Sequence, residues 1–191
     1  MPKSSSIITQ VEDFLFTPTA KKETGKFKIL LCSPEVAPYA NVGGLSKAVG
    51  DLARALIKLG HDARVFIPKF GHIDEEKYPS TIVCKGLRVP TGNKERPELV
   101  CNVKLHRSPS RLLVYFLENR EYYELRANVY GYKDDPIRWA LLSRGCLEFF
   151  GKHSDWVPDI FHANDWETGH IPNWLRTAYD KDPKLFSSAV I

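Results

Sequence analysis

The chain has 191 residues, of which 43% are hydrophobic and 12% aromatic, which is typical of a globular protein with room for a single α/β domain. Lysine and arginine number 27 against 23 aspartate and glutamate, and the resulting charge of +4 is too small to indicate a nucleic-acid-binding protein. No stretch reaches the roughly 18 consecutive apolar residues of a membrane span, and the first residues lack the charged-then-apolar order of a signal peptide.

Residues 1–25 mix serine, threonine, proline and lysine around a short apolar patch and are predicted to be an N-terminal extension, separate from a domain that covers 26–191. The domain begins with an apolar run at 27–33, which is expected to be a strand buried on both faces. Pro34 and Pro38 exclude a helix directly after it, so a loop is expected up to the glycine pair Gly43-Gly44.

A helix is predicted from this glycine pair to Gly60, because apolar residues recur at three- and four-residue steps. The stripe expected to face the core consists of Leu45, Ala48, Val49, Leu52, Leu56 and Leu59. Residues 62–68 form the next predicted strand. Together, 27–67 form a β-loop-α-β unit, which is parallel and right-handed in nearly all proteins.

Three further strands are expected at 81–89, 99–106 and 111–117, separated by turn-forming residues. A helix follows from Asp134 to Gly151, then a short strand at 158–163, a helix at about 168–179 and a last strand at 188–191. The predicted fold class is therefore α/β, with a Rossmann-like, mostly parallel sheet flanked by helices. Because the sequence stops inside the last strand, the chain is expected to be a fragment of a longer protein.

The cysteines and histidines indicate neither disulfides nor a metal site. The four cysteines are far apart and include no C-x-x-C pair (Cys32, Cys84, Cys101 and Cys146). This usage predicts reduced, packed thiols in a cytoplasmic protein. Three histidines of the C-terminal part have no recognised ligand spacing (His153, His162 and His170), so no metal is expected.

The glycine pair is the first candidate binding site, because ligands of open parallel sheets bind where the strands end. A helix start offers unpaired N–H groups and a partial positive charge, which favour an anion. Gly43 and Gly44 have no Cβ, which permits positive φ and close approach of a ligand. The alternative is a packing pair in a tight turn. Neither a G-x-G-x-x-G pattern nor a Walker phosphate loop is present.

A second polar cluster follows the strand predicted at 158–163. His162 and Asn164 alternate onto one side, and Asp165 projects where the strand ends, beside Trp166. A carboxylate next to an imidazole and an indole suits the hydroxyls and the ring of a sugar. The alternative is that Asp165 only caps the following helix. The turn around Tyr130 is either a carbohydrate platform or a plain surface turn.

Three stretches together resemble the bacterial glycogen and plant starch synthases, which are ADP-glucose-dependent retaining glucosyltransferases of family 5. They are "KILLCSPEVAPYANVGGLSKAVGDLARALIKLGHDARVFIP", "NREYYELRANVYGYKDDPIRWALLSRGCLEFF" and "PDIFHANDWETGHIPNWL", in the order of that family's N-terminal domain. The resemblance implies the N-terminal half of a GT-B enzyme, in which two Rossmann-like domains face a cleft. It also implies a missing C-terminal domain that binds most of the donor, while this domain binds most of the acceptor glucan.

The resemblance assigns the donor side to the mouth of the first helix. Gly43 and Gly44 would lie against the diphosphate and glucose of ADP-glucose. Two neighbouring donor-binding candidates depart from the family pattern: Asn41 stands where a lysine is common, and Lys47 where an aspartate is common. An amide is a weaker partner for a diphosphate than a cation, so this exchange leaves the donor nucleotide open.

The resemblance assigns catalysis to Asp165, which matches the acidic residue near the reacting centre. His162 matches the start of the same motif and, with Asn164 and Tyr130, is placed on the acceptor side. No metal or separate cofactor is implied, because cationic side chains and helix dipoles stabilise the leaving diphosphate. The implied reaction moves glucose from ADP-glucose to the non-reducing 4-OH of an α-1,4-glucan with retention. The alternatives are a GT-B transferase for another nucleotide sugar and a non-catalytic glucan-binding relative.

Overall fold

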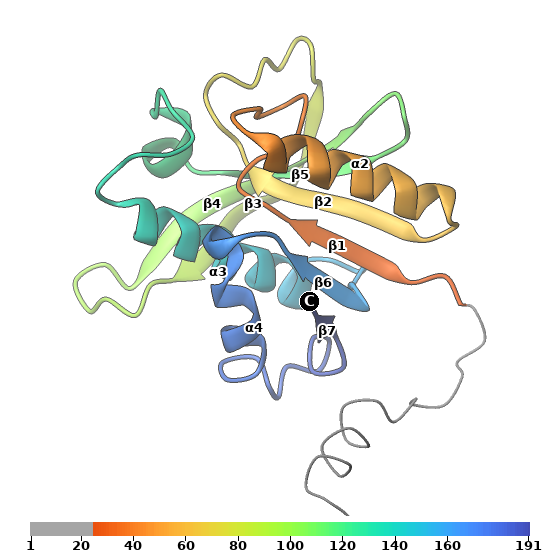
Figure 1. Ribbon diagram of the computed structural model, residues 1–191. Coiled ribbons are helices and arrows are strands. Elements are labelled where there is room, and N and C mark those ends of the chain that lie inside the picture. Colours follow the sequence, from red (N-terminus) through yellow and green to blue (C-terminus); the bar gives the residue numbers. More distant parts are fainter. Residues whose placement is uncertain (1–24) are drawn as a thin grey trace, which may run out of the picture.

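The computed structural model describes residues 25–191, so the extension predicted for 1–25 lies outside the described residues apart from its last position. A seven-stranded sheet in the order β3-β4-β5-β2-β1-β6-β7 forms the centre of the molecule (Figure 1). The strands are β1 (Lys28–Cys32), β2 (Asp62–Pro68), β3 (Ser80–Pro90), β4 (Glu98–Arg107), β5 (Leu113–Glu118), β6 (Ile160–Ala163) and β7 (Ala189–Val190). The helices are α2 (Gly44–Lys58), α3 (Asp135–Lys152) and α4 (His170–Leu175), with a π-helix η1 (Arg120–Glu124) and a 3₁₀ turn η2 (Trp166–Thr168).

Most of the sheet is parallel, as predicted. Strands β5, β2, β1, β6 and β7 run in one direction, and only β4 runs against both of its neighbours. Leu31 in β1 pairs with Val65 in β2 and with His162 in β6. The loops after β1, β2 and β6 therefore emerge at one edge of the sheet, which is where both predicted polar clusters lie.

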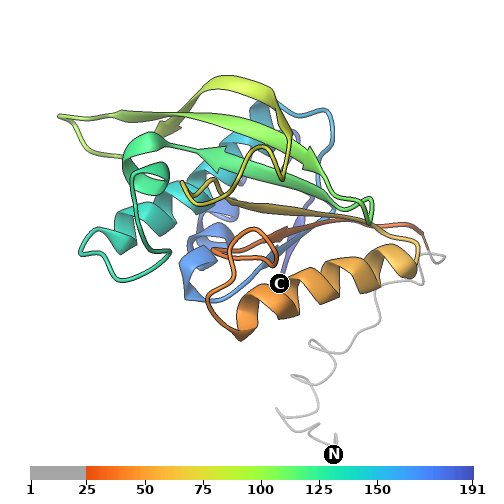
Figure 2. The ribbon, with the colours of Figure 1, turned by 90° about the horizontal axis from the view of Figure 1, so that it is seen from above.

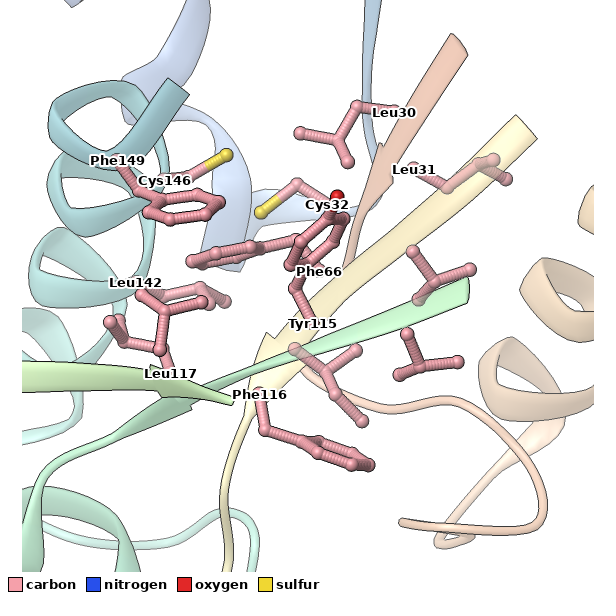
Figure 3. Packing of buried hydrophobic residues seen from close by; sticks show 14 of the residues in the cluster. Leu30, Leu31, Cys32, Phe66, Tyr115, Phe116, Leu117, Leu142, Cys146 and Phe149 are labelled. Atoms are coloured by element: carbon pink, nitrogen blue, oxygen red, sulfur yellow. The ribbon is translucent and has the colours of Figure 1, made fainter. Parts of the chain in front are cut away.

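Helices cover both faces of the sheet. Figure 3 shows α3 with Leu142, Cys146 and Phe149 on one side of β1, β2 and β5, and α2 on the other. Phe66 fills the α3 side, with its ring centroid 6.4 Å from that of Phe149. All four cysteines are free thiols. The buried strands and the two helix layers confirm the predicted α/β architecture.

The stripe predicted to bury α2 is confirmed only in part, because Val49 is buried and Leu45 and Leu56 pack against the core. The buried residues of α2 are Ser46, Val49, Gly50 and Ala53, whereas Leu52 is exposed. The helix packs through small residues because it approaches the chain closely: a Cβ on Gly50 would lie 3.4 Å from the carbonyl oxygen of Ala37. The larger leucines are displaced to the flank of the helix.

The helix predicted at about 168–179 is shorter than expected. Residues 166–168 form the 3₁₀ turn η2, and α4 ends at Leu175. The amides of Thr177 and Tyr179 both donate to the carbonyl of Trp174, at 3.2 and 3.0 Å, and these three- and five-residue spacings replace the four-residue spacing of the α-helix.

The long β3–β4 hairpin lies at the other end of the sheet, with its loop beside the start of α3 (Figure 2). Thr91 from the hairpin and Pro136 from α3 line a hollow of about 600 Å³ there. Within residues 25–191, no helix is both long and apolar enough to cross a membrane.

Candidate functional site

The loop between β1 and α2 is organised by the carboxylate of Glu35, which is 2% exposed. Its Oε2 accepts hydrogen bonds from the amides of Val42 at 2.6 Å and Gly43 at 3.2 Å. The hydroxyl of Ser33 donates to the carbonyl of Glu35 at 2.8 Å. A buried carboxylate with amide partners holds a loop in one conformation. Two amides at the predicted anion site are therefore already occupied, and a negative charge lies beside them.

The glycine pair at the mouth of α2 is not required by the fold. Gly43 has φ −133° and ψ −167°, an extended conformation that any residue adopts, so the positive φ that a glycine permits is not used there. A Cβ on Gly44 would meet nothing within 4 Å, and one on Gly43 would lie 3.4 Å from Glu35 Oε1, an ordinary contact. The described residues thus give no packing reason for two glycines. Both are exposed and leave the backbone open to a ligand.

The side chain of Asn41 is hydrogen-bonded to the first turn of α2. Its Oδ1 accepts a hydrogen bond from the hydroxyl of Ser46 at 2.5 Å, and that hydroxyl also lies 2.8 Å from the carbonyl of Gly43. Because the oxygen of the amide is occupied, its nitrogen is the group left to donate. Lys47 is exposed on α2 and does not line the neighbouring cavity.

A cavity of about 710 Å³ opens between the loops after β1 and β2 and the loop before α3. Its lining is formed by Pro38, Tyr39, Asn41, Val42, His72, Asp74, Lys77, Tyr78 and residues 127–130. Tyr39 and Tyr78 pack edge to face, with ring centroids 4.8 Å apart. Burial and the nearby ammonium of Lys69 lower the pKa of His72, so its imidazole is neutral at neutral pH. Aromatic faces beside neutral and charged hydrogen-bonding groups suit a sugar chain.

Asp165 follows β6 in a conformation that side chains rarely adopt, with φ 64° and ψ 179°. Its carboxylate accepts a hydrogen bond from the amide of Trp166 at 2.7 Å. The capping alternative therefore holds in a limited form, since Asp165 caps the 3₁₀ turn η2 and not the longer helix that was predicted. The side chain of Trp166 is 61% exposed beside it. Strained backbone of this kind is concentrated at functional sites.

The two other predicted residues of this motif differ in their surroundings. The amide nitrogen of Asn164 donates to the carbonyls of Cys32 at 2.8 Å and His162 at 3.0 Å. Asn164 is buried and ties the ends of β1 and β6 together, so it positions Asp165. His162 is half-buried, and no described residue makes a hydrogen bond to its buried Nδ1.

Tyr130 connects the two clusters. Burial raises the pKa of its hydroxyl, and the carboxylates of Glu35, Glu167 and Asp165 raise it further. The structure therefore brings the loop before α3 together with the loops after β1 and β6. Tyr130 also lines the cavity together with Asn41. Within the described part of the chain, no three metal-ligating side chains group as a metal site requires.

Three features of the site have no predicted role in the sequence: Glu35 in the loop after the first strand, the cavity wall at 72–78, and Glu167 in the second polar cluster. A signal for the first two exists, because both segments directly follow parallel strands, and ligand sites form there. The burial of Glu35 and of Glu167 depends on loop conformations that carry no periodic pattern.

The family follows from comparison with known proteins. A model of the starch synthase catalytic domain matches residues 28–191. The chain belongs to this family. Glycogen synthase 1 of Geobacter metallireducens is 36% identical over 171 residues, which are 87% of this chain and 34% of that protein. A glycogen synthase of Clostridium perfringens is 36% identical over 156 residues, 82% of this chain and 31% of that protein.

One solved structure has the same fold. It is the catalytic domain of starch synthase IV from Arabidopsis thaliana bound to ADP and acarbose, with a TM-score of 0.77, 24% identity, and coverage of 87% of this chain and 33% of that one. The mostly parallel sheet flanked by helices is thus the GT-B-type fold of a starch synthase catalytic domain. The chain spans about a third of the length of these relatives.

Proposed function

We propose that this chain is the acceptor-side domain of a glucosyltransferase that moves glucose from ADP-glucose to the non-reducing end of an α-1,4-glucan with retention. The active enzyme is completed by a C-terminal domain that binds most of the donor. No metal or cofactor takes part, and the enzyme is cytoplasmic. In this proposal Asp165 acts at the reacting centre, and Asn41, Gly43, Gly44 and Lys47 belong to the donor side. Tyr130 and His162 belong to the acceptor side, with Asn164 holding the motif in place.

The observation that carries the proposal is the exposed glycine pair that the fold itself does not need. The pair leaves the backbone accessible to a ligand beside a cavity that is lined by tyrosines. Tyr130 of this cavity also lies close enough to Asp165, whose backbone is strained, for the carboxylate to affect its pKa. Because Glu35 already places a carboxylate at the mouth of α2, a sugar hydroxyl is the better neighbour there than a phosphate oxygen. The donor's glucose therefore approaches the glycines, with its diphosphate further out.

The proposal is tested with the complete gene product, including whatever follows residue 191. ADP-glucose, UDP-glucose and GDP-mannose are supplied in turn with glycogen, and transfer of labelled sugar is measured. The proposal requires ADP-glucose to be the preferred donor. Preference for another nucleotide sugar would make the protein a different GT-B transferase. Glucan binding without turnover of any donor would make it a non-catalytic relative.

Asn41→Lys is expected to raise kcat/KM for ADP-glucose by about tenfold, because a charged donor stabilises the leaving diphosphate more than an amide does. Asn41 lines the cavity, so the new ammonium reaches the same space. Steady-state kinetics at varied ADP-glucose measure the effect. Asn41→Met is the matched control, because methionine has similar length and no charge. An unchanged or lower kcat/KM for the lysine variant would show that the diphosphate does not lie near residue 41.

Residues 1–191 expressed alone are expected to transfer no glucose, because they span only about a third of the length of glycogen synthase relatives. The same assay of labelled glucose incorporation into glycogen measures this. Detectable synthase activity of the isolated chain would disprove the need for a further domain.

A further inference from the structure

Glu167 is an acidic residue beside the candidate site, and it has no part in the glucosyl transfer proposed above. It is 4% exposed, and its Oε2 is buried without a hydrogen-bond partner among residues 25–191. Buried side-chain oxygens nearly always have a partner, so this one calls for an explanation. Either a bound ligand donates a hydrogen bond to this oxygen, or the oxygen is protonated and donates to an acceptor on a ligand.

The position of Glu167 is firmly held. It lies in the turn η2, which begins directly after Asp165. The hydroxyl of Thr168 donates to the carbonyl of Asn164 at 3.0 Å, and the hydroxyl of Ser143 in α3 lies 3.4 Å from the carbonyl of Glu167. The turn is therefore fixed between β6 and α3. A side chain on such a turn meets a ligand with little loss of conformational freedom.

The surroundings of Glu167 are dominated by negative charge. Burial raises the pKa of its carboxyl, and the carboxylates of Asp165, Glu35 and Asp135 raise it further. The titratable groups that act on it are Asp165 at the start of η2, Glu35 in the loop after β1, Tyr130 in the loop before α3, and Asp135 in α3. Arg138 forms its ion pair with Asp135, at 2.5 Å. A proton on Glu167 thus removes its own repulsion with the three other acids.

We propose that Glu167 is a second substrate-binding carboxyl, which stays neutral and donates its proton in a hydrogen bond to a hydroxyl of the glucose unit held beside Asp165. This inference rests on the proposed glucosyl transfer. A sugar hydroxyl is both donor and acceptor, so it pairs with one ionised carboxylate and one protonated carboxyl at the same time. No bond is made or broken by Glu167. The glucose unit belongs either to the donor nucleotide or to the glucan. The test below distinguishes these two sources by measuring the binding of each ligand separately.

The inference predicts a specific pH dependence. The raised pKa keeps Glu167 protonated to higher pH than an ordinary glutamate. Sugar binding that needs this proton is complete at low pH and is lost as the pH rises through the pKa of Glu167. Ionisation removes the hydrogen-bond donor and adds a fourth negative charge to the cluster. A purely structural Glu167 would not couple ligand affinity to pH in this way.

The test compares wild-type protein, Glu167→Gln and Glu167→Ala in the complete gene product. Calorimetry measures the dissociation constants of ADP-glucose and of maltotetraose from pH 4.5, the ordinary pKa of a glutamate, up to pH 9. For the ligand that contacts Glu167, wild-type affinity should fall about tenfold across the range, while Glu167→Gln, a neutral isostere that still donates, should stay tight at every pH. Glu167→Ala should bind weakly at every pH. Thermal unfolding confirms that both variants fold.

The outcomes separate this inference from the proposed function. If the glutamine variant shows the same pH profile as the wild type for both ligands, or the alanine variant binds both as tightly as the wild type, Glu167 does not bind the sugar. The proposed glucosyl transfer is then still decided by the separate assay of labelled-sugar transfer to glycogen. If the wild-type protein binds neither ligand and transfers no glucose, the proposed function is wrong and the role of Glu167 falls with it.

Discussion

Replacing Asp165 with asparagine is expected to lower kcat of the complete enzyme by at least about 100-fold while the fold is retained. Asparagine has the shape of aspartate and keeps an oxygen that accepts from the Trp166 amide, so it adds no atoms against the backbone at φ 64° and ψ 179°. The substitution therefore preserves the cap of η2 and removes only the negative charge. A charge positioned at the reacting centre is needed mainly in the transition state, so kcat falls more than the affinity for substrates. Transfer of labelled glucose from ADP-glucose to glycogen measures kcat.

Two further substitutions separate the cap from the charge. Asp165→Ala removes both, and Asp165→Gly also relieves the backbone strain at φ 64°. Thermal unfolding should show the glycine variant at least as stable as the alanine variant, and neither should transfer glucose. If Asp165→Asn keeps more than a tenth of the wild-type kcat, the barrier has risen by less than ~1.4 kcal/mol. Asp165 would then serve only as the cap of η2.

The parallel strands could be predicted from the sequence because each is a short apolar run bounded by glycine or proline. Strand β2 matches the predicted 62–68, and β1 differs from the predicted 27–33 by one residue at each end. Hydrophobicity was less informative for α2, where it selects the largest apolar residues. Close packing selected small ones, because Gly50 lies against the backbone of Ala37. The period of the helix was right, and the predicted face was right at Val49, Leu45 and Leu56 but not at the exposed Leu52 and Leu59.

The candidate site could be predicted only in part. That the loops after β1 and β6 share one edge follows from parallel pairing, so the approach of Gly43 and Asp165 to a common edge was predictable. The convergence of Glu35, Tyr130 and Glu167 was not. It depends on the path of the loop before α3, which is held by side-chain contacts such as those of Arg138 to the carbonyls of Tyr122 and Val129. Such contacts leave no periodic signal.

Arg138 fixes that loop, and Arg138→Met is expected to reduce the free energy of unfolding by about 3–5 kcal/mol. The side chain is 0% exposed. Its Nε donates to the carbonyl of Tyr122 in η1, and its Nη1 donates to the carbonyl of Val129, both at 2.8 Å. Nη1 also pairs with the carboxylate of Asp135 at 2.5 Å. Methionine keeps the apolar volume but leaves a carboxylate that is only 13% exposed and two carbonyls without these partners. Urea unfolding followed by circular dichroism measures the loss.

A control variant and a double variant show whether this loss of stability comes from the unpaired carboxylate of Asp135. Lys133 is an exposed cation in the same loop, so Lys133→Met should change the free energy of unfolding by less than about 0.5 kcal/mol. Asp135→Asn combined with Arg138→Met should be more stable than Arg138→Met alone, because no uncompensated carboxylate remains. A loss below about 1 kcal/mol for the single variant would show that water replaces the guanidinium at no cost.

Since Arg138 holds the loop that carries Tyr130, a folded Arg138→Lys variant should also bind glucan more weakly. The buried arginine thereby connects the stability of the domain to the shape of the cavity that Tyr130 lines.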